Sequence, residues 1–335
     1  MEPTIRHVAR RAHTSVSTVS RVLTGSGPVA EATRNRVLEA IEELGYKPNA
    51  LARGLVRRRT GTIGVVIPDV ANPFYAEVLR GMSDVASGQG LHMLLVNADL
   101  SFAKEAEGFA LLQEKQVDGI VYTSGVITDG HRDIFHRLGR PVVLAATYDP
   151  DGTFPSVLVD SRAGAIMAMT HLLELGHRRI GVINGPEQDA VAGGPRWEGF
   201  RQAAAAWGVG LDPELVRTGD YRLESGYRAM ERLLADPHPP TAVVAASDLM
   251  AIGAMNAALD RGVRIPDDLS VVGFDNIWFS SAVRPALTTV AQPMYDIGAK
   301  ALHMLIEAVA GRTQPVVNWI QPYMVERAST APFRC

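Results

Sequence analysis

From residue 62 to residue 274, short runs rich in valine and isoleucine alternate with stretches that have the periodicity of amphipathic helices. The runs read TIGVVIP, HMLLV, DGIVY, PVVLA, VLV, RIGVIN, AVVAA and SVVGF. The helical stretches between them cover residues 74–86, 104–115, 163–175, 196–207, 226–234 and 249–261. Strand and helix in regular alternation are typical of a parallel sheet that helices cover on both faces. The number of runs predicts two such α/β sheets, with a boundary near residues 160–162.

The first sixty residues differ in charge from the rest of the chain. They carry 11 Lys and Arg against 5 Asp and Glu, a net charge of +6, whereas the remaining 275 residues carry 22 against 31, a net charge of −9. The total is −3, so the whole chain is not the basic body expected of an indiscriminate polyanion binder. Charge divided in this way indicates a basic arm for DNA on an acidic body.

The basic arm has the apolar spacing of three short helices. The three stripes consist of Ile5, Val8, Ala9 and Ala12, then Val19, Val22 and Leu23, then Val37, Ile41 and Leu44. Thr4 and Ser15 stand at the expected N-caps of the first two helices, and Gly45 follows the third. Only His13 and Thr14 separate the first two helices, which predicts a helix-turn-helix with its second helix in the DNA major groove. Any small helical bundle shows such stripes, so the positive charge and the exposed Ser, Thr and Arg residues decide in favour of DNA.

Two segments of the arm, VARRAHTSVSTVSRVLTG and GYKPNALARGL, resemble the DNA-binding region of the LacI/GalR family of bacterial transcriptional regulators. The resemblance implies that Val16, Ser17 and Arg21 read bases, and a bidentate contact of Arg21 with guanine supplies about 1–3 kcal/mol of discrimination. It also implies that residues 49–57 form a hinge helix in the minor groove, where Leu55 of each subunit wedges into a base step. The other expected DNA contacts are Thr4, Ser15, Thr18, Ser20, Asn49 and Arg53.

The arm departs from the family pattern at two places. His13 and Thr14 stand where the family usually has Gly-Val, so a residue other than glycine must take the turn. Ala30 stands in place of a capping serine, which removes a cap worth about 1 kcal/mol. Both departures concern the stability of the small domain and leave the DNA contacts in place.

The remainder resembles the two-lobe periplasmic-binding-protein fold that carries the effector site in this family. The resemblance is carried by IPDVANPFYAEVLRG, QVDGIVYTSG, LGHRRIGVINGP, SGYRAMERLL, PTAVVAASDLMAIGAMNA and VVGFDN. The expected fold is a small all-α helix-turn-helix domain with a hinge helix, followed by a two-lobe α/β core with parallel doubly wound sheets. Because ligands of open α/β sheets bind beyond the carboxyl ends of the strands, a cleft is expected there. Its expected residues are Phe74, Tyr75, Asp160, Arg196, Tyr221, Asp248, Asp275 and Trp278.

The resemblance also predicts the domain limits and the assembly. We expect the helix-turn-helix domain in residues 1–47, the hinge helix and linker in 48–60, and the effector-binding and dimerisation core in 61–335. Within the core, the N-lobe takes about 61–160 and 292–322, and the C-lobe takes about 161–291 and 323–335. A single helix-turn-helix reads only a few base pairs, so a homodimer on a pseudo-palindromic operator is expected. The chain ends without a leucine heptad, so no tetramerising tail is expected.

Several segments resemble, within the family, regulators of carbon catabolite control: KPNALARGL, KQVDGIVYTSGVIT, PVVLAAT, PSVLVD, RPALTTVAQPMYDIGA and ERAST. That likeness implies a co-repressor phosphoprotein, serine-phosphorylated HPr, on the outside of the N-lobe. The expected docking residues are Asp69, Asp84, Asp99, Tyr295, Asp296, Lys300 and His303. His303 stands where the relatives carry an arginine for the phosphoserine, and histidine is mostly neutral at pH 7, so Lys300 is expected to replace part of the charge.

The alternative input is a sugar or sugar phosphate in the cleft, as in other LacI-type repressors. It is weakened because Ala146 stands where sugar- or purine-responsive relatives usually carry an aspartate, and because no arginine lies between Gly185 and Arg196 to hold a purine. The phosphoprotein is therefore the favoured input. Whether the outcome is repression or also activation depends on the position of the operator.

Enzymatic and membrane functions are not expected. The chain has no GxGxxG after its first strand, no GxxxxGK[ST], no GxSxG and no HExxH, and His177 has no nucleophile nearby in sequence. Its one cysteine, Cys335, excludes an intrachain disulfide and a cysteine-based zinc site, so no metal and no cofactor are expected. The N-terminus lacks the apolar core of a signal peptide and no apolar run reaches 18 residues, so we expect a cytoplasmic protein rather than a sugar-binding transport component.

Overall fold

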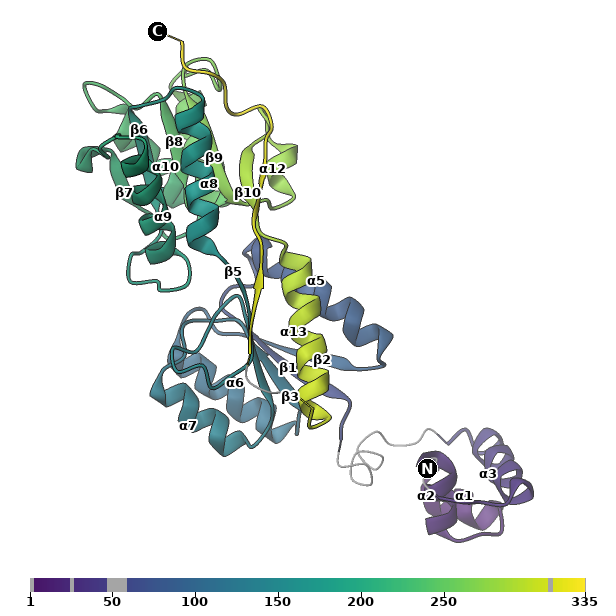
Figure 1. Ribbon diagram of the computed structural model, residues 1–335. Coiled ribbons are helices and arrows are strands. Elements are labelled where there is room, and N and C mark those ends of the chain that lie inside the picture. Colours follow the sequence, from purple (N-terminus) through teal and green to yellow (C-terminus); the bar gives the residue numbers. More distant parts are fainter. Residues whose placement is uncertain (1–2, 25–26, 47–58, 313–315, 335) are drawn as a thin grey trace.

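The computed structural model describes residues 3–24, 27–46, 59–312 and 316–334. These residues form a three-helix domain and two lobes, each built on a sheet (Figure 1). The expected hinge helix at 49–57, with Asn49, Arg53 and Leu55, lies outside the described residues, as does Cys335.

The arm folds as the predicted helix-turn-helix. Its helices are α1 (Ile5–Arg11), α2 (Val16–Thr24) and α3 (Glu31–Glu43), and each contributes one completely buried valine to the core, namely Val8, Val19 and Val37. Ser15 Oγ accepts the backbone N–H of Thr18 at 3.1 Å and so caps α2. His13 takes the turn with a left-handed φ of +50°, and Ala30 starts α3 without a side-chain cap. The two departures in the sequence are therefore two points where this small domain gives up stability.

The core contains the two predicted parallel sheets. The strands of the first are β1 (Thr62–Ile67), β2 (His92–Asn97), β3 (Gly119–Tyr122), β4 (Val142–Ala145), β5 (Ser156–Val159) and β11 (Val317–Ile320). The strands of the second are β6 (Ile180–Asn184), β7 (Val216–Thr218), β8 (Ala242–Ala245), β9 (Ser270–Asp275), β10 (Thr288–Ala291) and β12 (Tyr323–Val325). The spatial orders are β11, β5, β4, β3, β1, β2 and β12, β10, β9, β8, β6, β7. Every pairing is parallel except that of β12 with β10, an antiparallel pair at the edge of the second sheet.

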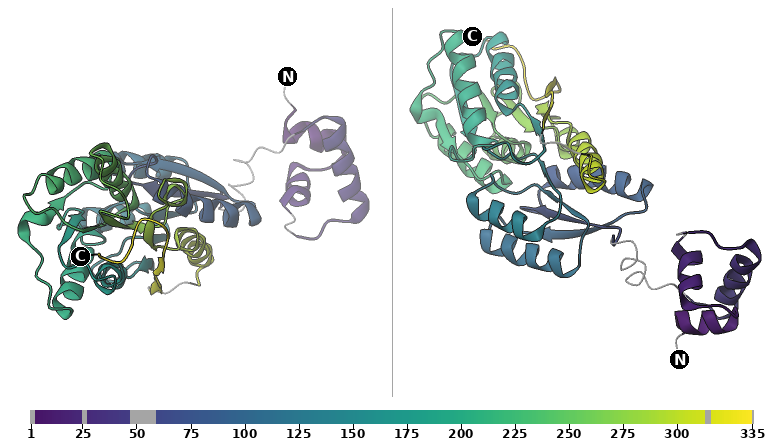
Figure 2. Two further views of the ribbon diagram at one scale, coloured as in Figure 1. Left: turned by 90° about the horizontal axis from the view of Figure 1, so that it is seen from above. Right: turned by 60° about the horizontal axis from the view of Figure 1, so that its bottom comes forward.

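Helices cover both faces of the first sheet (Figure 2). The helices are α5 (Pro73–Gly88) and α13 (Met294–Val309) on one face, and α6 (Phe102–Glu114) and α7 (Asp129–Leu138) on the other. Consecutive strand residues point to opposite faces, so Val65 joins the core under α5 and α13 whereas Val66 joins Phe109 and Phe135 under α6 and α7. Because both faces of β1, β3, β4 and β5 are buried, these strands are largely apolar and lack the alternation of a half-exposed strand, whereas β2 and β11 at the edges are partly exposed.

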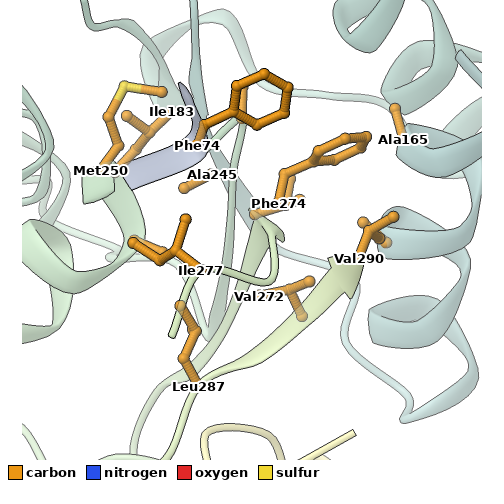
Figure 3. Close-up of a cluster of buried hydrophobic side chains, with 14 of the residues drawn as sticks. Phe74, Ala165, Ile183, Ala245, Met250, Val272, Phe274, Ile277, Leu287 and Val290 are labelled. Atoms are coloured by element: carbon orange, nitrogen blue, oxygen red, sulfur yellow. The ribbon is translucent and has the colours of Figure 1, made fainter. Parts of the chain in front are cut away.

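The second sheet is covered in the same way. The pair α8 (Ser161–Glu174) and α9 (Gly193–Ala206) packs on one face and the pair α10 (Leu223–Leu234) and α11 (Asp248–Asp260) on the other; the short α12 (Phe279–Ala282) and a 3-10 turn (Pro213–Leu215) complete this lobe. Phe274 of β9 lies between Ala165 of α8 and Val290 of β10 (Figure 3). A side chain at Gly164 would collide with the Phe274 ring, so the close packing of α8 on this sheet requires a glycine there. No described helix is both long enough and apolar enough to cross a membrane.

The chain passes between the two sheets at residues 160, 292–293 and 321–322. It runs through β1 to β5 in the first sheet and β6 to β10 in the second, then returns to the first with α13 and β11 before it ends at β12 in the second. Helix α13 therefore joins residues from the end of the chain to the lobe that the chain forms first (Figure 1). It lies against α5 with backbone in contact, because a Cβ at Gly81 would overlap the Tyr295 carbonyl and one at Gly298 would overlap the Val78 carbonyl.

His177 holds the last residues of the chain to the second sheet. Its Nδ1 lies 3.0 Å from Thr241 Oγ1, and its Nε2 lies 3.1 Å from the Ala331 carbonyl oxygen. A neutral ring satisfies both contacts by accepting at Nδ1 and donating at Nε2. Burial lowers the pKa of His177, and burial also lowers the pKa of His171 on α8. His177 is thus a structural residue of the C-lobe.

His177 and the half-buried His171 both contribute to the pH dependence of the core's stability. Their pKa is lower in the folded chain than in the unfolded chain, so the contribution of these histidines to the free energy of unfolding should fall as the pH drops below the unfolded value of about 6.5, where only the unfolded chain takes up their protons. Urea unfolding at about pH 7.5 and at about pH 5.5 measures the difference. His177→Gln should destabilise the protein more at the higher pH than at the lower pH, and so change the difference, whereas the exposed His136→Gln should leave the difference unchanged. An unchanged difference in His177→Gln would contradict this expectation.

Candidate functional sites

The first candidate site is the exposed face of α2. Val16 is 42% exposed, and Ser17 and Arg21 also face solvent, whereas Val19 between them is buried. The hydroxyls at the start of the helix contact one another, because Ser15 Oγ lies 2.7 Å from Ser17 Oγ and 2.9 Å from Thr18 Oγ1. Arg21 forms no ion pair with any described residue. The three expected base-reading residues, Val16, Ser17 and Arg21, therefore share one accessible face of α2, and the Arg21 cation is available to bind DNA.

The remaining described residues of the expected DNA contacts lie at the edges of this face. Thr4 is exposed at the start of α1, where its backbone N–H donates to His7 Nδ1 at 3.2 Å. Thr18 and Ser20 are half-buried on the flanks of α2. Among the described residues of the three helices, the only ion pair joins Arg11 of α1 to Glu43 of α3 at 2.6 Å, so α2 takes no part in it.

The second candidate site is a cavity of about 1060 Å³ between the two lobes. It is lined by loops that follow the carboxyl ends of strands in both sheets, as expected for open α/β sheets. Five of the expected cleft residues line it, namely Phe74, Tyr75, Arg196, Tyr221 and Asp275. Ala146, the residue that stands in place of an aspartate, lines it as well.

Three of the expected cleft residues do not line the cavity. Asp160 is the N-cap of α8 and accepts the backbone N–H of Ala163 at 2.9 Å. Trp278 is 58% exposed and stacks on Phe279, with ring centroids 3.6 Å apart, outside the cavity. Both residues were expected in the cleft because they follow strands. Asp160 caps the helix that comes after it, so its side chain points toward that helix. Trp278 stands further along its loop and points away from the cavity.

Asp248 is the third residue outside the cavity lining. It is completely buried beneath the loop that follows β9, where its carboxylate accepts from Thr289 Oγ1 at 2.5 Å, from Ser280 Oγ at 2.6 Å and from the Ile277 N–H at 2.9 Å. With three donors in place, this carboxylate is used to hold the loop of Asp275. It supports the cavity and does not line it.

The centre of the cavity is a buried arginine and carboxylate. Arg196 Nη2 lies 3.9 Å from Asp275 Oδ1, and the guanidinium lies 3.9 Å above the centroid of the Phe274 ring. Arg196 Nη1 donates to the Ala246 carbonyl, whereas its buried Nε has no hydrogen-bond partner among the described residues. Burial raises the pKa of Asp275 to about 7, although the positive charge of Arg196 lowers it in part. Arg196 Nε is thus a buried donor without a partner, and it belongs to the side chain next to the Asp275 carboxyl. A ligand with hydroxyl groups could form hydrogen bonds with both groups.

Sequence reasoning missed three residues that shape this centre. Gln292 Nε2 donates to Asp275 Oδ1 at 2.7 Å, and Tyr221 donates its hydroxyl proton to Asp189 at 2.5 Å. Gln292 follows β10, a strand that the apolar runs did not mark, and Asp189 lies inside a long loop without a distinguishing neighbour. Arg222 reaches from the C-lobe to Asp69 of the N-lobe at 3.4 Å and so joins the two walls.

Backbone strain gathers at the cavity. Among the described residues other than glycine with φ in the left-handed region, the following line it: Asp99, Leu100, Ala146, Tyr221 and Asp275. Such conformations cost about 1–3 kcal/mol each and persist where the surrounding structure imposes them, often at binding sites. No pattern in the sequence marked these positions as places of backbone strain, because none of them is a glycine.

The charged residues of the lining are mainly acidic. Its carboxylate residues are Asp69, Asp99, Asp189, Asp220, Glu224 and Asp275, and its cationic residues are Arg196 and Arg222. Each arginine already has a carboxylate partner. The cavity therefore favours a ligand that donates hydrogen bonds over a ligand that brings further negative charge.

The expected docking residues fall into two separate groups. Asp69 and Asp99 line the interlobe cavity, and Asp99 is bound by Lys104 at 2.5 Å. The other residues lie exposed on the outer surface of α5 and α13, namely Asp84, Tyr295, Asp296, Lys300 and His303. Tyr295 donates to Asp84 at 3.2 Å and so joins the two helices. Asp84 stands eleven residues beyond Pro73, or about 16 Å along α5, a separation that a single docked protein can span.

No cluster of three or more His, Cys, Asp or Glu side chains suited to a metal ion occurs among the described residues. His177, the one histidine considered as a base, is fully occupied by Thr241 and Ala331 in the C-lobe.

Two family models match the chain. The model described as bacterial regulatory proteins, lacI family, matches residues 4–49, and the model described as a periplasmic binding protein-like domain matches residues 169–330. The first covers the helix-turn-helix, and the second covers most of the C-lobe together with α13 and β11, which return to the N-lobe.

Relatives and solved structures agree with these models. The chain is 42% identical over 305 residues to catabolite control protein A of Priestia megaterium, a match that covers 91% of this chain and 92% of that protein. It is similar to the transcriptional regulator CelR in complex with cellobiose, with a TM-score of 0.75, 35% identity and coverage of 98% and 99%. It is also similar to the lac repressor dimer bound to operator, with a TM-score of 0.88, 25% identity and coverage of 99% and 100%. These relatives are transcriptional regulators and not enzymes. The chain belongs to the LacI family and is a DNA-binding transcriptional regulator.

Proposed function

We propose that this regulator is a homodimeric repressor that binds a pseudo-palindromic operator and responds to a small ligand in its interlobe cavity. The observation that carries the proposal is the cavity of about 1060 Å³, with its unpartnered Arg196 Nε and its strained, hydrogen-bonding walls. The two lobes that form the cavity would change their arrangement on binding, and the arm would respond through a coupling free energy.

The proposed ligand is an uncharged polyhydroxylated molecule of about disaccharide size. The volume lies at the upper end of the range for small-molecule sites, about 300–1,000 Å³. The carboxylates of the lining accept hydrogen bonds from hydroxyls, whereas a phosphate would meet two arginines that are already paired. Of the two ligands expected at this site, the sugar is therefore favoured over the sugar phosphate. CelR, whose structure contains cellobiose, supports cellobiose as the first probe.

A second candidate input is serine-phosphorylated HPr on the surface of α5 and α13, with carbon catabolism as the regulated process. It is supported by 42% identity to a catabolite control protein and by Lys300, which is exposed on α13 and forms no ion pair with a described residue. Two of its expected docking residues, Asp69 and Asp99, line the cavity as well. His303, on the same helix face, lies near Glu307, which is bound by Arg312 at 2.5 Å.

The DNA contacts proposed for the described part of the arm are those of α1 and α2. Val16, Ser17 and Arg21 would read bases, and Thr4, Ser15, Thr18 and Ser20 would bind phosphates or groove edges. Asn49, Arg53 and Leu55 complete the proposal from the sequence alone.

Replacement of Arg21 should separate specific from general DNA binding. Arg21→Ala should weaken binding to a duplex selected by the wild-type protein about tenfold or more, because a bidentate guanine contact is lost. Binding to an unrelated duplex should change little beyond the loss of one charge. Arg36→Ala removes the same charge from exposed α3 and serves as the control in a gel-shift titration. Equal losses on both duplexes for Arg21→Ala would refute its base-reading role.

Replacement of Asp275 should remove the response to ligand without loss of DNA binding. Asp275→Asn should weaken cellobiose binding, measured by calorimetry, about tenfold or more, since a hydrogen bond to a charged group is lost. Trp278→Ala changes a residue nearby but outside the cavity and should bind as the wild type does. A panel of uncharged sugars and their phosphates should show binding by uncharged members. Binding by none of them, or only by the phosphates, would overturn the proposed ligand class.

The phosphoprotein candidate has its own test at α13. If the surface binds phosphoserine, His303→Arg should tighten the binding of serine-phosphorylated HPr, because arginine is always charged and binds phosphate bidentately. Lys300→Ala should weaken it, while the exposed Lys115→Ala on the same lobe should not. Calorimetry with phosphorylated and unphosphorylated HPr measures both changes. No binding of the phosphorylated protein by either the wild type or His303→Arg would exclude this input.

A further inference from the structure

Residues 59–61, which follow the arm, are hydrogen-bonded to the N-lobe. Asp118, a buried residue just before β3, accepts the Thr60 N–H at 2.7 Å and the Gly61 N–H at 2.8 Å, one on each carboxylate oxygen. Thr60 Oγ1 donates to the Gln116 carbonyl at 3.1 Å. These bonds hold both backbone groups at the entry to β1 and use the carboxylate fully.

A second contact ties the same segment to the end of α13. The Arg59 side chain donates from Nη2 to the carbonyl oxygen of Val309, the last residue of the helix, at 2.6 Å. The final carbonyls of a helix have no partner within it, so a cation at this end satisfies one of them and meets the negative end of the helix dipole.

The two contacts belong to one tightly packed unit. Gly119, next to Asp118, faces the last turn of α13, and a Cβ there would lie 2.8 Å from Leu305 Cδ1 and 3.1 Å from Val309 Cγ2. The start of β3 and the end of α13 are therefore packed closely, without space for a further side-chain atom between them. A shift of α13 along its axis must move the point at which the linker is held.

The opposite end of α13 begins at the cavity. Gln292, two residues before the helix, donates to Asp275 at 2.7 Å and lines the cavity with it. A helix of 16 residues is about 24 Å long. One rigid element thus connects the buried carboxyl at the cavity with the first described residues after the arm.

We propose that Asp118 and Arg59 are positioning residues for operator binding: they fix the point and direction in which the arm leaves the N-lobe, and α13 links that point to the cavity. The inference rests on the proposed function, since it explains how an event in the cavity reaches the arm. Neither residue contacts the cavity. Loss of the anchor should therefore reduce the preference for operator and leave ligand binding unchanged.

The test compares full-length variants by fluorescence anisotropy on two duplexes of equal length, one selected from random sequence by the wild type and one unrelated. Asp118→Ala and Arg59→Ala should each lower the ratio of selected to unrelated affinity by about tenfold, a coupling of ordinary size. Arg59→Lys should restore most of the ratio, because lysine can also donate to Val309. Hydrogen exchange at the Thr60 and Gly61 amides should accelerate in Asp118→Ala. The exposed Asp133→Ala and Arg137→Ala are the matched controls and should behave as the wild type does.

The outcomes separate the anchor from other roles. Arg59 lies outside the packed core, so its variant tests the anchor even if Asp118→Ala folds poorly. Equal losses on both duplexes for Arg59→Ala would show a phosphate contact and overturn the anchor, as would an unchanged ratio in both variants. A selection in which the wild type prefers no duplex would instead refute the proposed function.

Discussion

The close approach of α5 and α13 is the contact on which the rest of the core depends. Gly81 and Gly298 allow the two backbones to touch, and any side chain at either position would overlap a carbonyl of the other helix. This contact places Phe74 and Tyr75, at the start of α5, at the cavity, while Gln292 reaches the same cavity from the segment before α13. It also aligns Asp84 with Tyr295 on the outer surface. Two glycines far apart in sequence therefore determine the geometry of both candidate input sites.

The local pattern of the chain was enough to predict most of the regular structure. All six helices expected in the core occur with limits within three residues, and the eight apolar runs became β1 to β6, β8 and β9. The sequence did not mark β7, β10, β11 or β12. Of these, β11 and β12 lie at sheet edges with half-exposed residues, so neither carries a continuous apolar run. No local pattern in the sequence predicts that α13 packs on the first lobe, because its position depends on its contact with α5.

The candidate site was predictable to a smaller extent. Strand ends indicated Arg196, Tyr221 and Asp275 correctly as cavity residues, because the rule for open α/β sheets concerns the edge of the sheet. The rule cannot tell whether a polar residue at that edge points into the cavity, caps the next helix as Asp160 does, or supports a loop from below as Asp248 does. Those outcomes depend on side-chain direction and on partners from distant segments.

The return of the chain to its first lobe has a consequence for biosynthesis. The five strands of the N-lobe that leave the ribosome first have one face without its α13 cover, and one edge without β11, until residues 294–320 have been made. Exposed apolar strands of this kind are prone to aggregation while they wait, and domains otherwise fold as they emerge. The C-lobe also waits for late residues, namely β12 and the terminal segment that contacts His177. The lobe that is translated first is therefore completed only near the end of translation, and the arm that precedes it is attached to an incomplete lobe for most of that time.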